Sequence, residues 1–149
     1  MRGERTAQAT AHQLVHCVLD SDSDGLTDAL EVVVVQGDRL ADYVREVVAE
    51  LIQVATTAMR DTIGPTTDTM AFGVDLRDDT DDPVAIDDLV PQSRATVRAL
   101  LADLNGSPED ARFQLDLAVR ELDPLTGLDA VRRALTMTVA LIQWTGEAR

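Results

Sequence analysis

The sequence contains no lysine and a single cysteine, and aromatic residues make up only 3% of it. Without lysine, the chain has neither a Schiff-base lysine nor the phosphate-binding lysine of a Walker-type loop. The single cysteine, Cys17, allows no intramolecular disulfide and excludes cysteine-rich zinc sites. With so few aromatic side chains, we expect neither a base-stacking platform for nucleic acids nor an aromatic sugar-binding groove.

Long hydrophobic runs are also missing. Strictly apolar segments such as 32–35 are far shorter than a membrane span. Arg2 and Arg5 are not followed by the apolar core that a signal peptide needs. The sequence therefore predicts a cytoplasmic protein with no membrane partner.

Acidic residues dominate the charged ones: 27 aspartates and glutamates stand against 13 arginines, which gives a net charge of -14. A charge of this sign repels phosphate backbones and anionic lipids, so we expect no nucleic-acid partner. At 149 residues the chain suits one helical domain spanning 1–149, and 45% hydrophobic residues are enough for a core.

Apolar residues recur at helical spacing in six segments. These segments are 5–19, 29–35, 39–62, 91–104, 108–122 and 128–145. Segment 29–35 holds four consecutive valines, which suit a strand or a buried helix, and the acidic Asp28 and Glu31 favour a helix start. Because the connections are short, the sequence predicts an all-α fold, an antiparallel bundle of about five to six helices.

Turn and cap residues mark the expected boundaries. Asp38 suits the N-cap of the longest helix, and Ser107 followed by Pro108 suits the start of another. The pair Asp123 and Pro124 is expected to break the chain between the last two helices. Residues 66–88 alternate apolar and polar positions and predict a short β-hairpin or an ordered loop.

The sharpest local motif is the stretch DSDSDGLTDALE at 20–31. Its oxygen-bearing residues have the spacing of the ligands in a calcium-binding loop. Gly25 occupies the position at which such a loop turns sharply. The motif resembles an EF-hand calcium loop. The resemblance implies Ca²⁺ held by Asp20, Asp22, Asp24, the Leu26 carbonyl, Asp28 directly or through water, and Glu31.

The motif departs from an EF-hand in two respects. Thr27 stands where a branched apolar residue is usual, and the chain has no second loop to pair with the first. The residue pattern also resembles thrombospondin type-3-like calcium repeats, which occur in tandem. The alternative interpretation is an acidic connection in which Asp24 or Thr27 caps the next helix.

A second candidate metal site is the helical pair His12 and His16, with Asp20 one turn further on. Two imidazoles and a carboxylate can bind zinc, but Gln13 stands where a metalloprotease helix carries glutamate. The alternative is two half-buried histidines beside an inert Cys17 thiol. The seven aspartates between 75 and 88 are interpreted as solvated loop charge.

The sequence contains no cofactor motif and no nucleophile motif. A turn at 105–107 joins two helices as in a helix-turn-helix, but the acidic balance disfavours DNA binding. We therefore predict a non-enzymatic protein-protein interaction or accessory module, with a protein partner or self-association as a homodimer. The alternatives are a calcium-binding module and a metal-dependent enzyme using the His12 and His16 face.

Overall fold

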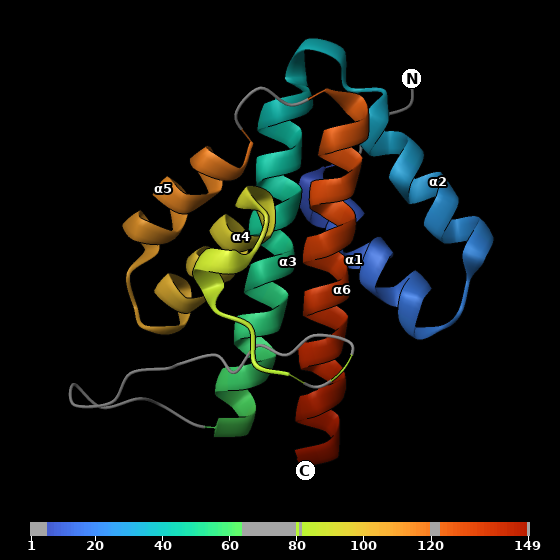
Figure 1. The fold of residues 1–149 in the computed structure, drawn as a ribbon. Coiled ribbons are helices and arrows are strands. Elements are labelled where there is room, and N and C mark those ends of the chain that lie inside the picture. Colours follow the sequence, from blue (N-terminus) through green and yellow to red (C-terminus); the bar gives the residue numbers. More distant parts are fainter. Residues whose placement is uncertain (1–5, 64–79, 81, 120–122, 149) are drawn as a thin grey trace.

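The structure is a computed structural model that describes residues 6–63, 80, 82–119 and 123–148 (Figure 1). This part of the chain is all-α, as predicted: it holds six α-helices and two short 3-10 helices and no strand. The elements are α1 Ala7–Leu19, α2 Ser23–Val34, η1 Gly37–Arg39, α3 Leu40–Ile63, η2 Ile86–Asp88, α4 Pro91–Leu104, α5 Pro108–Ala118 and α6 Pro124–Ala148. None of these helices is both long and apolar enough to cross a bilayer.

The two longest helices, α3 and α6, lie side by side at the centre and run in the same direction (Figure 1). Near their first turns, a Cβ atom on Gly127 of α6 would lie 3.2 Å from Val44 Cγ2 of α3. Further along, Thr138 Oγ1 of α6 donates a 3.0 Å hydrogen bond to the Leu51 carbonyl of α3. Residue numbers rise together along both helices, so this pair is parallel.

The expectation of an antiparallel bundle is therefore wrong for the central pair. Short connections make neighbours antiparallel only when the helices are consecutive in sequence. Residues 64–123, which include α4 and α5, separate α3 from α6. This long connection leaves the chain free to return to the starting end before α6 begins.

A helical hairpin lies on each side of the central pair (Figure 1). α1 and α2 pack together on one side, and α4 and α5 pack together on the other. In the turn between α4 and α5, Gly106 has a φ of +81°, which glycine adopts without the steric cost of a side chain. In the turn between α1 and α2, Ser21 has a φ of +57°.

One apolar core joins all six helices. It is built around the predicted apolar stripe of α3, in which Val44, Val47 and Leu51 are completely inaccessible to solvent. Further buried members come from each other helix: Leu14, Val33, Leu100, Leu104, Leu115, Val131 and Leu135. Because every helix contributes to one cluster, burial of this apolar surface holds the two hairpins to the central pair.

Threonine side chains enter this core with their hydroxyl groups hydrogen-bonded. Thr10 Oγ1 of α1 lies 2.6 Å from the Tyr43 hydroxyl of α3, and both side chains are buried. Thr56 Oγ1 donates to Asp103 Oδ2 at 2.8 Å and so ties α3 to α4. These bonds offset the cost of removing hydroxyl groups from water.

Some predicted boundaries differ from the structure. Helix α2 begins at Ser23 and includes most of the valine run, so the helical interpretation of 32–35 is confirmed as far as Val34. Asp38 lies inside η1 and is not the N-cap of α3. Ser107 occupies the N-cap position of α5, but its side chain makes no capping bond.

The predicted break at Asp123 and Pro124 is in fact the start of α6. Asp123 Oδ1 accepts a 2.7 Å hydrogen bond from the Thr126 amide. Pro124 is the first helical residue, a position where proline's missing N–H costs nothing. As at Ser107 and Pro108, a proline occupies the first helical position, but here the residue before it also makes the capping bond that Ser107 lacks.

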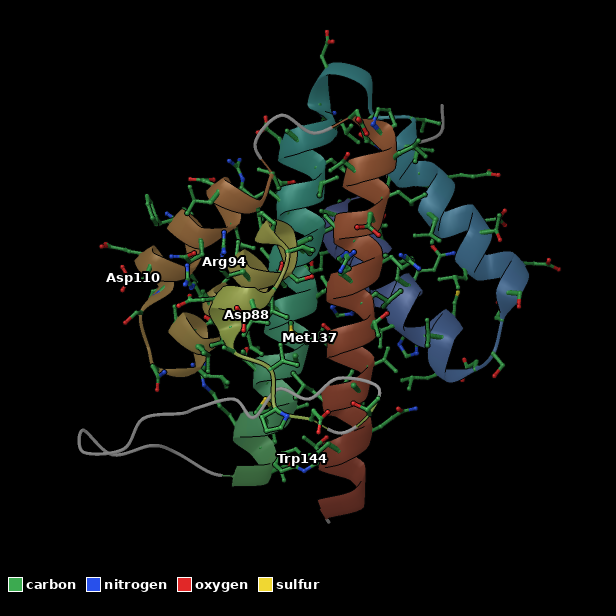
Figure 2. The ribbon with its side chains drawn as sticks, viewed as in Figure 1. Asp88, Arg94, Asp110, Met137 and Trp144 are labelled. Atoms are coloured by element: carbon green, nitrogen blue, oxygen red, sulfur yellow. The ribbon has the colours of Figure 1, made fainter. Side chains whose placement is uncertain are left out.

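Most of the predicted β-hairpin or ordered loop at 66–88 lies outside the described residues. The described part, residues 80 and 82–88, contains η2 and no hairpin. Two arginines of α4 hold η2: Arg98 forms an ion pair of 2.5 Å with Asp87, and Arg94 donates to the Asp87 carbonyl at 3.3 Å. Figure 2 labels Arg94 of α4 and Asp88 of η2.

Candidate functional site

A groove of about 450 Å³ runs between α3 and α5 and reaches the end of α4. Its volume falls within the range of ligand-binding clefts, roughly 300–1,000 Å³. Apolar side chains and charged side chains both line it. The lining residues are Arg45, Glu46, Ala49, Glu50, Ile52, Gln53, Asp103, Pro108, Ala111, Arg112, Leu115 and Asp116.

The position of α5 creates this groove. α5 packs mainly on α4 through the tight turn at Gly106, and it contacts α3 far less. Where the two helices face each other, α3 contributes Ala49 and α5 contributes Ala111, and these small side chains leave space unfilled. Ile52 and Leu115 are buried and supply further apolar surface.

One arginine of the groove is held by two carboxylates. Arg45 Nη1 lies 3.0 Å from Asp116 Oδ1 of α5, and Arg45 Nη2 lies 3.3 Å from Asp42 Oδ1 of its own helix. Its side chain is 36% exposed, so each pair contributes little free energy of folding. The Arg45 to Asp116 pair bridges α3 and α5 at one end of the groove.

At the other end, hydrogen bonds hold Asp103 in place. Its Oδ2 accepts from Thr56, and its backbone carbonyl accepts from Arg60. Between the two ends, Glu46 and Glu50 lie one helical turn apart on α3. Within the described part of the chain, neither glutamate forms an ion pair. Among the described residues, the groove therefore presents two adjacent carboxylates that form no ion pair.

The opposite face of α5 is also unusual because it exposes large apolar side chains. Phe113 is 58% exposed and Leu117 is 38% exposed, one turn apart on the same helix. Asp110 of this helix points away from the bundle (Figure 2). Other exposed large apolar residues belong to other elements: Leu19, Val35, Val90, Leu125 and Trp144.

The residues of the predicted calcium loop do not form a loop. Asp20 is the C-cap of α1, and Asp22 is the N-cap of α2, where its Oδ1 accepts a 3.0 Å hydrogen bond from the Gly25 amide. The remaining predicted ligands, Asp24, Leu26, Asp28 and Glu31, all lie within α2.

This helical geometry keeps the six predicted ligands from converging on one point. The Leu26 amide donates to the Asp22 carbonyl at 3.0 Å, as in a helix, and Gly25 has no left-handed φ. Among the described residues, no group of three or more histidine, cysteine or acidic side chains is placed to hold a metal ion. An EF-hand arrangement of these residues requires the first turns of α2 to unwind.

The residues of the second candidate metal site are placed on α1. His12 and His16 lie one turn apart and are exposed, whereas the interpretation as half-buried histidines expected partial burial. Cys17 is buried, as expected for a structural thiol. Burial and the nearby carboxylates of Asp22, Asp20 and Asp28 raise the pKa of the Cys17 thiol, which keeps it in the unreactive protonated form.

Pattern analysis did not single out the groove residues. Glu46 and Glu50 fall on the polar side of an amphipathic helix and look like ordinary solvated positions. The sequence does contain one signal: Glu46 and Glu50 are like charges four residues apart, which weaken a helix slightly. The groove itself depends on where α5 lies, which the sequence pattern of α3 does not contain.

Comparison of the chain with models of protein families, with curated proteins and with solved structures found no match.

Proposed function

We propose that the protein is a non-enzymatic protein-protein interaction module and that α5 is its recognition helix. The observation that carries this proposal is the pair Phe113 and Leu117, exposed one turn apart on a helix at the outside of the fold. Single exposed apolar residues are common on protein surfaces. Two large ones on one stripe of an outer helix form the kind of anchor that partner proteins cover.

The neighbouring groove supports the same proposal. It lies along the α3 side of α5, so a partner that covers Phe113 and Leu117 can also reach around the helix into it. Apolar anchors bordered by charged residues are typical of protein interfaces. The partner is either a different protein or a second copy of this chain.

Two double variants of the full chain test the proposal. Phe113→Ser with Leu117→Ser removes the α5 anchors, and Val35→Ser with Leu125→Ser removes two apolar residues that lie elsewhere and are even more exposed. Each protein is immobilised for capture from a lysate of the source organism, and its mass in solution is measured by light scattering. Circular dichroism checks that both variants keep the wild-type helix content.

We expect the wild type and the Val35, Leu125 variant to capture the same protein or to show the mass of a dimer. The α5 variant should do neither. A partner that both variants retain, or a wild type that is monomeric and captures nothing specific, contradicts the proposal. Equal loss in both variants also contradicts it, because the effect then follows general surface hydrophobicity.

The calcium-binding alternative stays a prediction, and its EF-hand form requires the first turns of α2 to unwind. Calorimetry of chelator-treated protein with calcium tests it directly. Saturable binding that Asp20→Ala with Glu31→Ala abolishes supports a calcium site. The absence of binding up to roughly millimolar calcium, the weak end for such loops, contradicts it.

A further inference from the structure

We infer that the groove between α3 and α5 is an anchor site for an arginine side chain of the partner protein, with its guanidinium held between Glu46 and Glu50. The inference rests on the proposed function, because it names the chemistry of the partner segment that lies against α5. It depends on three features of the groove: its charge balance, its apolar surface and its size.

The charge balance favours a cation. The groove is lined by four carboxylates and two arginines. Arg45 already pairs with Asp116 and Asp42. Of the four groove carboxylates, Glu46, Glu50 and Asp103 therefore remain available to an incoming cation. A net charge of -14 on the whole chain adds a long-range attraction for basic segments.

Glu46 and Glu50 are the carboxylates best suited to hold the incoming charge. They repel each other across one helical turn, and a cation between them replaces this repulsion with two attractions. Glu50 is half-buried, so its charge is less screened by solvent than a fully exposed one. Guanidinium suits this pair better than ammonium, because its planar fork can donate to two carboxylates at once.

The apolar surface of the groove suits the rest of an arginine side chain. Ala49 lies between the two glutamates in sequence, and Ile52, Ala111 and Leu115 add further apolar lining. The three methylene groups of arginine can lie on this surface while the charged end reaches the carboxylates. Neither a purely acidic patch nor a purely apolar cleft offers both contacts.

Arg112 determines the orientation of the bound side chain. It lines the α5 side of the groove and forms no ion pair within the described residues. Its positive charge repels a guanidinium, so we expect the bound side chain to lie against α3. The same arginine is free to pair with a carboxylate or a backbone carbonyl of the partner segment.

Titration of the isotopically labelled full chain with a blocked arginine, N-acetyl-L-arginine N-methylamide, tests the inference by NMR. The matched probe is the citrulline analogue, which keeps the shape of arginine but has no charge. The test variant is Glu46→Gln with Glu50→Gln. The control variant is Asp24→Asn with Asp28→Asn, which removes two exposed carboxylates at the same spacing on α2. Ionic strength is held near physiological values throughout.

We expect saturable shifts of amides along the groove, with a dissociation constant in the millimolar range that suits one anchoring side chain. The test variant should weaken binding at least about tenfold, as expected for the loss of charge-assisted hydrogen bonds. The control variant should stay within about twofold of wild type, and citrulline should not bind. Both variants should keep the wild-type spectrum elsewhere.

Three results would overturn the inference: shifts spread equally over α2 and the groove, equal binding of citrulline, or no saturation. Its failure can be told apart from failure of the proposed function. If partner binding requires Phe113 and Leu117 but the groove does not bind arginine, only the inference is contradicted. If the groove binds arginine but no partner requires Phe113 and Leu117, the proposed function is contradicted and the groove remains an arginine-binding site.

Discussion

Thr138 Oγ1 donates a hydrogen bond of 3.0 Å to the backbone carbonyl of Leu51, from the middle of α6 to the middle of α3. Thr138 and Leu51 are both completely buried. The bond gives the donor a partner in a core closed to solvent, and it relates the lengthwise position of one helix to the other.

Replacing Thr138 with valine keeps the shape of the side chain and removes the donor. We expect a loss of about 1 kcal/mol in the free energy of unfolding, measured by urea denaturation. Thr136→Val is the matched control, because Thr136 is an exposed residue of α6 whose hydroxyl bonds within its own helix. The control should change the free energy by less than about 0.5 kcal/mol. Equal losses in the two variants would contradict this role for the bond to Leu51.

Gly127 allows the close approach of α6 to α3. A leucine there has its Cβ within 3.2 Å of Val44 and 3.5 Å of Leu40, with the rest of the side chain still to be accommodated. We expect Gly127→Leu to destabilise the protein by about 2 kcal/mol or more. Gly146, near the other end of α6, has no atom of the described residues within 4 Å of its Cβ position. Gly146→Leu should be neutral or slightly stabilising, because leucine favours a helix. Thermal unfolding of both variants compares the two sites.

Asp22 begins helix α2 by capping the Gly25 amide. Removal of the cap in Asp22→Ala should cost about 1 kcal/mol in the free energy of unfolding, whereas Asp22→Asn should retain most of it. Asp28→Ala serves as a control, because Asp28 is exposed in the same helix and caps nothing. A larger loss in the control than in Asp22→Ala would show that the carboxylate charge on α2 matters more than the cap.

Asp129 links stability to pH. Hydrogen bonds from Arg132 at 2.8 Å and Arg133 at 2.6 Å lower the pKa of its carboxyl group. A lowered folded-state pKa gives stability that is present above the unfolded value, about 3.9, and is lost as pH falls through the folded value. The side chain is 36% exposed, so solvent screening keeps the contribution small.

We therefore expect Asp129→Asn to lower the melting temperature at pH 7 and to match the wild type at pH values below the folded-state pKa. The difference in melting temperature between the two proteins is the quantity to compare, because acid also reduces the repulsion among the many carboxylates of this chain. Asp28→Asn should show no such convergence, because Asp28 has no arginine partner within the described residues. A constant difference across the pH range would contradict the assignment.

Local structure was largely predictable because it depends on neighbouring residues. The apolar stripe of α3 at Val44, Val47 and Leu51 follows directly from helical spacing, and all three residues are buried. The start of α5 at Pro108 was predicted from the same kind of local signal. The start of α6 was misread, because an aspartate followed by proline can precede a break or cap a helix, and the local sequence is the same in both cases.

The calcium motif shows that one local sequence pattern can suit two geometries. Acidic residues spaced as calcium ligands also suit the N-cap and the first turn of a helix, because both environments favour negative charge. In the structure Asp22 caps α2, and Asp24 and Asp28 follow inside it. Whether the segment also binds calcium stays a prediction for calorimetry.

The helical fold class, the acidic charge and the apolar face of each helix follow from the amino-acid sequence alone, because composition and spacing are local properties. The packing of the helices sets the parallel course of α3 and α6 and leaves a groove between α3 and α5. It also places Glu46 and Glu50 in this groove, where they form no ion pair with any described residue. These features depend on how helices distant in sequence share one core, and shape complementarity among many side chains decides that packing.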